Sequence, residues 1–239
     1  MESGKKVSEL RGHSDRVSAV DVSPDSRKIA SGSIDSTVCV WLLSTGQRLL
    51  GPWVHDNTVY TVKFSPDGRF IATATLRSIL IYDSQIGNLV VNVSIGVSFS
   101  LNHSLAWSSN GKHLFAVSPG KITRLDATTG ITLSQWSVHG DKYNRIAVAN
   151  DGAFITASSD SSVSFWDATT HKQIGSVTEH TGKVECMVIS TNNDVVIGSD
   201  EKITLRNFCN ILPSSYWNNV STFESSTRLA AQRTTPQSA

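Results

Sequence analysis

The sequence lacks the features of a disulfide-bonded, secreted or membrane-spanning protein. Its 239 residues include only three cysteines, which lie far apart and form no CxxC pair. This spacing argues against a disulfide framework and against a zinc ribbon. No window approaches the roughly 18 uninterrupted apolar residues of a membrane-spanning helix, and the N-terminal stretch MESGKKVSELRGHSD has no apolar segment of the kind found in signal peptides. We therefore expect an intracellular protein, cytoplasmic or nuclear, without membrane insertion.

An excess of charge of one sign is also missing. The chain carries 21 Lys and Arg against 20 Asp and Glu, a formal net charge of +1, with no long run of either sign. Dedicated nucleic-acid-binding proteins usually show a basic patch or stripe, so we expect no dedicated nucleic-acid binding. The motifs HxH and HExxH and repeated pairs of carboxylates, which hold metal ions in many enzymes, do not occur. We expect no metal ion and no cofactor.

Sustained helical periodicity is absent as well. The chain reads instead as short apolar runs rich in β-branched residues, separated by clusters of Gly, Asn, Asp, Ser and Pro. Examples are the runs VSAVDVS, RKIASGS and TVCVWLL, followed by YTVKFS, RFIATAT and SILIYD. Such runs are typical of β-strands, and the turn clusters recur about every eight to twelve residues. The sequence therefore predicts an all-β fold, either a sandwich or a propeller.

The turn residues repeat with a single period. One kind of tight turn recurs at separations of 42, 43, 41 and 42 residues (67−25, 110−67, 151−110, 193−151), and its members are Asp25, Asp67, Asn110, Asp151 and Asn193. A second series steps by 42, 41 and 43 residues (46−4, 87−46, 130−87), and its members are Gly4, Gly46, Gly87 and Gly130, with His171 in the next slot. A period of about 40 to 45 residues with four strands per repeat is typical of propeller blades.

Short motifs within the repeats narrow the family. GH at 12–13 and HG at 139–140 lie at corresponding positions of two repeats. FWD at 165–167 ends a repeat with both tryptophan and aspartate, while VWL at 40–42 keeps only the tryptophan of that ending and IYD at 81–83 only the aspartate. From about residue 4 to 210 the chain resembles the WD40 repeat family. The resemblance implies a WD40 β-propeller with about five blades of four antiparallel strands, and we place the blades at residues 11–51, 52–94, 95–136, 137–178 and 179–212.

The two ends of the chain are expected to differ from the array. Residues 1–10 align with the end of the first blade and are expected to form the outer strand of a preceding or closing blade. Residues 213–239 are polar and are expected to form a flexible tail. The chain is then either an unusually small closed ring or an incomplete portion of a seven-bladed ring. The second alternative leaves open blade edges, which imply a partner chain or an oligomer.

A serine, an aspartate and a histidine at Ser31, Asp35 and His13 could be taken for a catalytic triad. In the WD40 family, however, a histidine, a serine or threonine, an aspartate and a tryptophan form a structural tetrad of hydrogen bonds. The resemblance assigns two such tetrads, which are His13, Ser31, Asp35 and Trp41 in the first blade and His139, Thr156, Asp160 and Trp166 in the fourth. Because the constellation recurs and no GxSxG motif accompanies it, we favour a structural role and expect no enzyme activity.

The remaining blades depart from the tetrad pattern. The second keeps His55 and Thr73 but has Arg77 near the place of the turn aspartate and Tyr82 in place of the tryptophan. The tryptophan position holds Leu125 in the third blade and Arg206 in the fifth. We therefore expect stability to vary from blade to blade, because each repeat contributes its own share together with its neighbour interfaces.

The expected function is that of a non-catalytic scaffold that binds other proteins or peptides. Loops on a propeller face carry binding residues on a rigid support, and tyrosine and arginine are favoured interface residues. The residues that we expect to contact a partner are Arg16, Tyr60, Arg77, Tyr143, Arg145 and Lys183. Two alternatives remain, which are a propeller-fold hydrolase with a central site and a reader of phosphorylated or otherwise modified peptides.

Overall fold

A computed structural model of the chain describes residues 9–94, 104–118, 120–138, 145–149, 154–159, 161–189, 194–199 and 202–207. Within these ranges the secondary structure consists of nineteen β-strands, all in antiparallel sheets, and no helix. It follows that no helix in this part of the chain could cross a membrane. The all-β prediction is confirmed.

The strands form five sheets, and each sheet takes its strands in chain order. The first two sheets consist of β1 (Val17–Val22), β2 (Lys28–Ser33), β3 (Thr37–Leu42) and β4 (Arg48–Val54), and of β5 (Thr61–Phe64), β6 (Phe70–Ala74), β7 (Ser78–Asp83) and β8 (Leu89–Ser94). The third consists of β9 (Ser104–Trp107), β10 (His113–Ser118), β11 (Lys121–Asp126) and β12 (Thr132–Ser137). The last two consist of β13 (Arg145–Ala149), β14 (Phe154–Ser159), β15 (Ser162–Asp167) and β16 (Gln173–Glu179), and of β17 (Val184–Ile189), β18 (Asp194–Ser199) and β19 (Lys202–Asn207).

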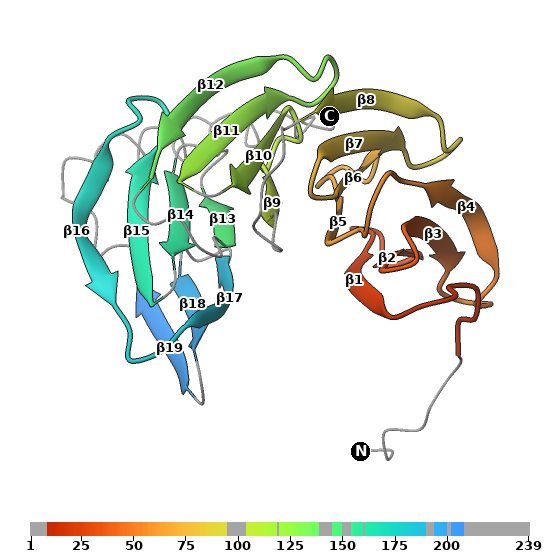
Figure 1. The fold of residues 1–239 in the computed structure, drawn as a ribbon, viewed down its shortest axis with the longest axis horizontal. Helices are drawn as coiled ribbons and strands as arrows, with labels where there is room; N and C mark the ends of the chain where they lie inside the picture. Colours follow the sequence, from red (N-terminus) through yellow and green to blue (C-terminus); the bar gives the residue numbers. More distant parts are fainter. Residues whose placement is uncertain are drawn as a thin grey trace, which may run out of the picture.

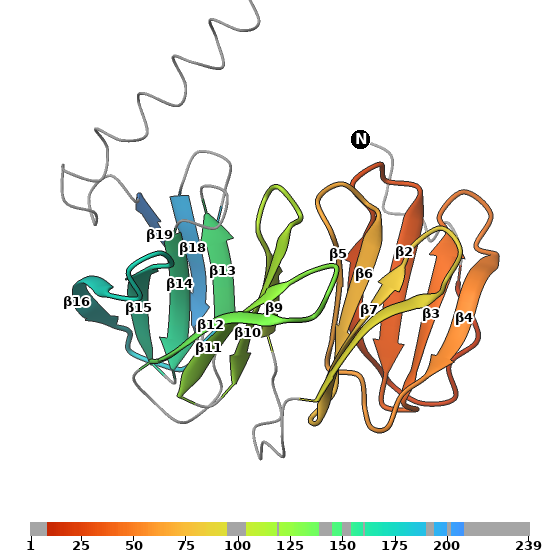
Figure 2. The ribbon, with the colours of Figure 1, turned by 90° about the horizontal axis from the view of Figure 1, so that it is seen from above.

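The five sheets stand side by side in an arc, as the blades of a propeller do (Figure 1). The first strand of each sheet lies nearest the centre, and these inner strands pack in the order β1, β5, β9, β13 and β17. Seen from the side, the strands run across the thickness of the arc (Figure 2). The first and fifth sheets lie at opposite ends of the arc, so the described residues form five blades without closing a ring. The predicted blade count is confirmed.

The first series of tight turns is held by side-chain caps. In the turns at Asp25, Asp67 and Asn110, the serine two residues earlier donates its hydroxyl to the side-chain oxygen, at 2.6, 2.6 and 2.9 Å. The same oxygen accepts a main-chain N–H from two residues further on. Asp and Asn favour turns for this reason. The other two members of the series, at residues 151 and 193, lie outside the described residues.

The second series places glycine where the backbone is left-handed. Gly46, Gly87 and Gly130 have φ angles of 73°, 77° and 72°, and His171 occupies the same place with a φ of 59°. Each donates its N–H to the carbonyl oxygen four residues earlier and so closes the turn into the outer strand. A residue without a Cβ atom adopts this conformation without steric cost, which explains why glycine recurs there. Gly4 lies outside the described residues.

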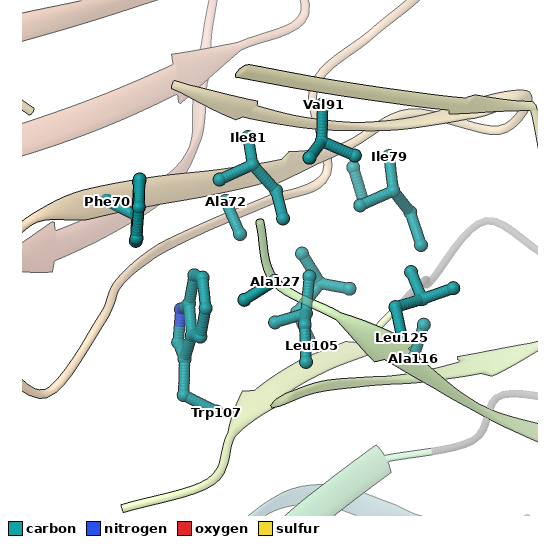
Figure 3. Packing of buried hydrophobic residues seen from close by; sticks show 12 residues of the cluster. Phe70, Ala72, Ile79, Ile81, Val91, Leu105, Trp107, Ala116, Leu125 and Ala127 are labelled. Atoms are coloured by element: carbon teal, nitrogen blue, oxygen red, sulfur yellow. The ribbon is translucent and has the colours of Figure 1, made fainter. Parts of the chain in front are cut away.

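The core consists of apolar clusters between neighbouring blades. Alternate residues of a strand point to opposite sides of its sheet, so each sheet that has a neighbour on both sides contributes to two clusters. Between the second and third blades, for example, Ile79 and Ile81 of β7 pack against Leu105 and Trp107 of β9 (Figure 3). Similar clusters lie between the first and second, third and fourth, and fourth and fifth blades. Burial between blades therefore holds the arc together.

The structure differs from some of the expected blade boundaries and does not describe others. Strand β4 continues to Val54, past the boundary expected at residue 51. Among the described residues the fifth sheet has three strands rather than four. Glu9 and Leu10 are described and belong to no strand, whereas residues 1–8 and 208–239 lie outside the described residues. The outer strand expected at residues 1–10 and the tail expected at 213–239 therefore stay predictions.

Candidate functional site

The first blade brings its four expected tetrad residues together. The Nδ1 atom of His13 lies 3.0 Å from Asp35 Oδ2, and its Nε2 atom lies 2.7 Å from Ser31 Oγ. The indole N–H of Trp41 donates to the same Ser31 oxygen at 2.8 Å. Thr37, which the sequence did not single out, donates its hydroxyl to Asp35 Oδ1 at 2.7 Å. The network joins the loop before β1 to strands β2 and β3.

This network leaves little capacity for catalysis at Ser31. The Ser31 side chain is buried, and its hydroxyl already has three partners, which are the imidazole of His13, the indole of Trp41 and the carbonyl oxygen of Cys39. Both ring nitrogens of His13 are also engaged. A nucleophilic serine must reach a substrate, with donors placed to stabilise an oxyanion. The geometry is that of a buried hydrogen-bond network, which we call a buried tie, in which each polar side-chain atom has a hydrogen-bond partner.

Asp35 is held in its charged form. Burial opposes ionisation, but hydrogen bonds from Thr37, Ser14 and His13 outweigh that effect and lower the pKa of Asp35 from its ordinary 3.8 to about 2. The main-chain N–H groups of Ser14 and Thr37 donate at 2.8 and 2.9 Å. A carboxylate that accepts several such bonds is stabilised relative to its neutral acid. The carboxylate therefore stabilises the folded loop at neutral pH.

The prediction that Thr156 belongs to the tetrad of the fourth blade is wrong, because the indole of Trp166 bonds to another residue. The indole N–H of Trp166 donates at 2.8 Å to Ser164 Oγ, and the hydroxyl of Thr156 donates at 3.3 Å to Met187 Sδ in the fifth blade. In the first blade Trp41 pairs across the sheet with Ile29, two residues before Ser31. Trp166 pairs with Ile155, so the register equivalent of Ser31 is Ala157.

The cause is a shorter turn. Residues 34–36 separate β2 from β3, whereas only residues 160–161 separate β14 from β15. Counting back from the tryptophan by the first blade's spacing therefore arrives one residue out of register. A shift of one residue moves a side chain to the opposite face of a sheet, and Thr156 accordingly faces the fifth blade. The other two members of this tetrad, His139 and Asp160, lie outside the described residues.

The second blade keeps part of the network in another form. His55 Nε2 lies 2.9 Å from Thr73 Oγ1, as the spacing predicts, but Nδ1 lies 3.0 Å from the carbonyl oxygen of Trp53. A carbonyl can only accept, so Nδ1 carries the proton and Nε2 accepts from Thr73. Tyr82 replaces the tryptophan and stacks on Trp53, with ring centroids 4.1 Å apart. Burial raises the pKa of Tyr82 to about 12.

Asp56 supplies the carboxylate that the second blade's turn lacks. Its Oδ1 atom accepts hydrogen bonds from Thr75 at 3.0 Å and Ser78 at 3.3 Å, across the turn that contains Arg77. The carboxylate thus comes from the loop rather than from the turn. The sequence did not predict this role for Asp56, although its position directly after His55 was a usable signal.

We expect the stability of the protein to fall as the pH drops below about 6.5, and His55 to contribute to that loss. Burial lowers the pKa of His55 below its ordinary 6.5, so the unfolded chain takes up a proton more readily than the folded one. The free energy of unfolding therefore decreases as the pH falls from about 6.5 toward the lower pKa of His55 in the folded protein. The variant His55→Asn should show a smaller difference in urea midpoint between pH 7.5 and pH 5.5 than the wild type. An equal difference in both proteins would contradict this assignment.

The third and fifth blades have no comparable tie among the described residues. Leu125, paired with Leu114, fills the tryptophan position of the third blade with apolar packing. In the fifth blade, His180 Nε2 and Arg206 Nε are buried without a hydrogen-bond partner among the described residues. Burial, and then the positive charge of Arg206, lowers the pKa of His180. These two blades rely on apolar contacts with their neighbours.

Three of the expected partner-binding residues lie in loops at one face of the arc. We call this the front face. It consists of the residues that precede the sheets (11–16, 55–60 and 180–183) and the turns between second and third strands (34–36 and 75–77). Arg16 and Arg77 are exposed, and Tyr60 is half-buried. Each of them precedes a strand directly, so the sheet edge fixes its position.

The other expected partner-binding residues differ in their surroundings. Arg145 donates from Nε to the carbonyl oxygen of Glu185 at 2.8 Å, and its guanidinium lies 3.9 Å from that residue's carboxylate. Lys183 lies 3.0 Å from the same carboxylate. Glu185, which the sequence analysis did not single out, thus engages both cations within the chain. Tyr143 lies outside the described residues.

Within the described part of the chain, no group of three or more His, Cys, Asp or Glu residues is arranged to hold a metal ion. Cys39 is buried, and burial raises the pKa of its thiol. Cys186 is exposed. A raised pKa leaves less of the Cys39 thiol in the reactive thiolate form.

Comparison with known proteins gives the same architecture. A family model for the WD domain, G-beta repeat, matches residues 4–41, 49–83 and 130–167. Two solved structures, of U3-55K and of the RRP9 WD40 repeats, superpose with a TM-score of 0.72 each. Both are 20% identical to this chain; they cover 84% and 83% of it, and 63% and 62% of their own chains are covered. At this identity the likeness shows the fold alone.

Two curated relatives are subunit I of eukaryotic translation initiation factor 3. The protein from Vanderwaltozyma polyspora is 26% identical over 193 residues, which are 72% of this chain and 55% of the relative. The one from Neosartorya fischeri is 31% identical over 179 residues, which are 66% of this chain and 52% of the relative. The chain thus spans about half the length of these relatives. The three matched repeats and the five-bladed arc show that the chain belongs to the WD40 repeat family.

Proposed function

We propose that the chain is a non-catalytic scaffold that binds partner proteins or peptides through the front face. The observation that carries this proposal is that some polar side chains of the first two blades are buried and hydrogen-bonded within the protein, while others are exposed. His13, Ser31 and Asp35 bond to one another in the interior, while Arg16 and Arg77 project into solvent. Buried ties of this kind fix the loops, and exposed residues on fixed loops bind with little loss of conformational entropy.

The relatives support the same class of function. They are named as subunits of a translation initiation factor, which is the designation of a component of a larger assembly. We propose by analogy that this chain also works within a complex and inside the cell. The choice between cytoplasm and nucleus stays a prediction. Fold analogy gives the class of function and does not choose the partner.

The reader of modified peptides is a narrower version of the proposal. The guanidinium of Arg77 is exposed and has no partner among the described residues, so it is free to pair with a phosphate. Arg145, another arginine that we expected to contact a partner, is engaged by Glu185. The hydrolase alternative requires a central site, and within the described ranges no three His, Cys, Asp or Glu residues are grouped as metal ligands.

Affinity capture with a matched pair of variants tests the proposal. The tagged chain is expressed in cells of the source organism, and the captured proteins are identified by mass spectrometry. A front-face variant carrying R16E, Tyr60→Ser and R77E should lose most specific partners. A control variant carrying R27E and Ile86→Ser, exposed residues at the other ends of the strands, should keep them. Equal loss, or equal retention, in both variants would contradict binding by the front face.

A further inference from the structure

A cavity of about 540 Å³ lies between the first and second blades, beside the front face. One wall comes from Val54, at the end of β4, and from the residues directly after it. The other wall is the face of strands β7 and β8 that points toward the first blade. Three cross-strand pairs line this wall, and they are Ser78 with Ser94, Leu80 with Asn92, and Tyr82 with Leu89. The cavity is large enough for the side chains of a short peptide.

The base of the cavity is apolar and fixed in place. Leu80 and Tyr82 are buried, and the Tyr82 ring is held by stacking on Trp53. The imidazole of His55 also lies in the wall, and both of its nitrogens are engaged. A rigid apolar base of this kind receives an apolar side chain without first reorganising.

The rim of the cavity has an apolar side. Val54 is 77% exposed and Leu89 is 50% exposed, although both line the cavity. An apolar side chain seated between them would remove apolar surface from water, which is the main source of affinity at such sites. The apolar rim and the apolar base together indicate a hydrophobic anchor residue in the ligand.

The other side of the rim is polar and carries one unpaired cation. The guanidinium of Arg77 has no hydrogen bond or ion pair among the described residues, whereas the Oδ1 atom of Asp56 is engaged by Thr75 and Ser78. Asn92 and Ser94 are exposed on strand β8 and offer donors and acceptors to a peptide main chain. An arginine fork matches a carboxylate in geometry and charge.

These features favour a peptide over other ligands. A nucleic acid would need more than one unpaired cation to pair with its successive phosphates. A lipid surface would be opposed by the polar side of the rim. An extended peptide with an apolar side chain next to an acidic one satisfies each part of the cavity.

We infer that the cavity between the first two blades binds an extended segment of a partner protein, which inserts an apolar side chain beside Leu80 and Tyr82 and pairs an adjacent carboxylate with Arg77. This inference deepens the proposed scaffold function and rests on it. Val54 and Leu89 cover the apolar anchor. Asp56 keeps the turn that carries Arg77 in place through its bonds to Thr75 and Ser78.

The probe is a phage-displayed library of random dodecapeptides, selected on the immobilised full chain. Enriched sequences are made as fluorescein-labelled peptides, and their Kd values are measured by fluorescence anisotropy. We expect a shared pattern of an apolar residue beside Asp or Glu. R77E should weaken binding about tenfold or more, and Val54→Ser several-fold. The matched controls are R27E, an exposed arginine outside both the cavity and the front face, and Leu49→Ser, an exposed leucine on the same strand as Val54, and both should bind within about twofold of the wild type.

Other outcomes would overturn the inference. Enriched peptides that bind R77E and Val54→Ser as tightly as the wild type would exclude the cavity. If binding is instead lost in R16E, a front-face variant outside the cavity, the scaffold function stands on another part of the front face and the cavity assignment fails. A selection that enriches no peptide also overturns it, while the capture experiment still decides the scaffold function. Binding of poly(U) or of phosphatidylserine vesicles that R77E abolishes would show a different class of ligand.

Discussion

Replacing Asp35 with alanine is expected to lower the free energy of unfolding by about 3 kcal/mol. The side chains of His13 and Asp35 are only 6% and 7% exposed, so water cannot replace the lost carboxylate. The change leaves His13 Nδ1, the hydroxyl of Thr37 and two main-chain N–H groups without their acceptor. A buried group that loses its partner costs its full desolvation penalty. The midpoint of thermal unfolding should fall by roughly 10 °C.

The same experiment separates a structural from a catalytic aspartate. Urea unfolding followed by circular dichroism and tryptophan fluorescence gives the change in stability. The variant Asp15→Ala removes a nearby exposed carboxylate, whose bond in the structure is to the main chain of the next residue, and should change stability by less than about 0.5 kcal/mol. An Asp35→Ala protein as stable as the wild type would refute the buried tie.

Replacing Phe115 with alanine is expected to cost about 4 kcal/mol. Phe115 is completely buried between the third and fourth blades, where it packs in a cluster with Ile146 and Ile155. The third blade has leucine in place of the tetrad tryptophan, so apolar packing has to stabilise it. Removing a buried aromatic ring loses its transfer free energy and leaves a cavity that the surrounding sheets cannot fill.

Leu133 provides the control for this prediction. It belongs to the same blade, on β12, and is 48% exposed, so Leu133→Ala should lower stability by less than about 1 kcal/mol. Both variants are compared by urea unfolding at pH 7.5. Similar losses in the two proteins would mean that burial between blades is not what holds the third blade in the arc.

The repeat itself could be predicted from the sequence because its signals are local. A turn needs Asp or Asn to cap main-chain N–H groups within a few residues, and a left-handed residue favours glycine. Both requirements therefore place the same type of residue at the same position of successive repeats. Asp67 caps its turn and Gly87 has a positive φ, as the two series indicate. The resemblance to WD40 repeats implied the first-blade tetrad, and the structure brings its four residues together.

Contacts that depend on exact register or on another blade could not be predicted in this way. The resemblance assigned Thr156 to the tetrad of the fourth blade, but a turn shorter by one residue places it on the opposite face of the sheet. Arg145 was expected in a partner interface, but Glu185 from the next blade engages it. A sequence shows the distance between two residues along the chain and not across the gap between two sheets.

The sequence by itself determined the all-β repeat, its period and those turns of the two repeating series that the structure describes, because these follow from the backbone needs of single residues. Only the tertiary structure decided which polar side chains are buried ties and which project from the front face, since that depends on the packing of one blade against another. The same packing forms the cavity that joins Val54 of the first blade to Arg77 and Tyr82 of the second. Its walls come from separate sheets, so no single stretch of sequence specifies it.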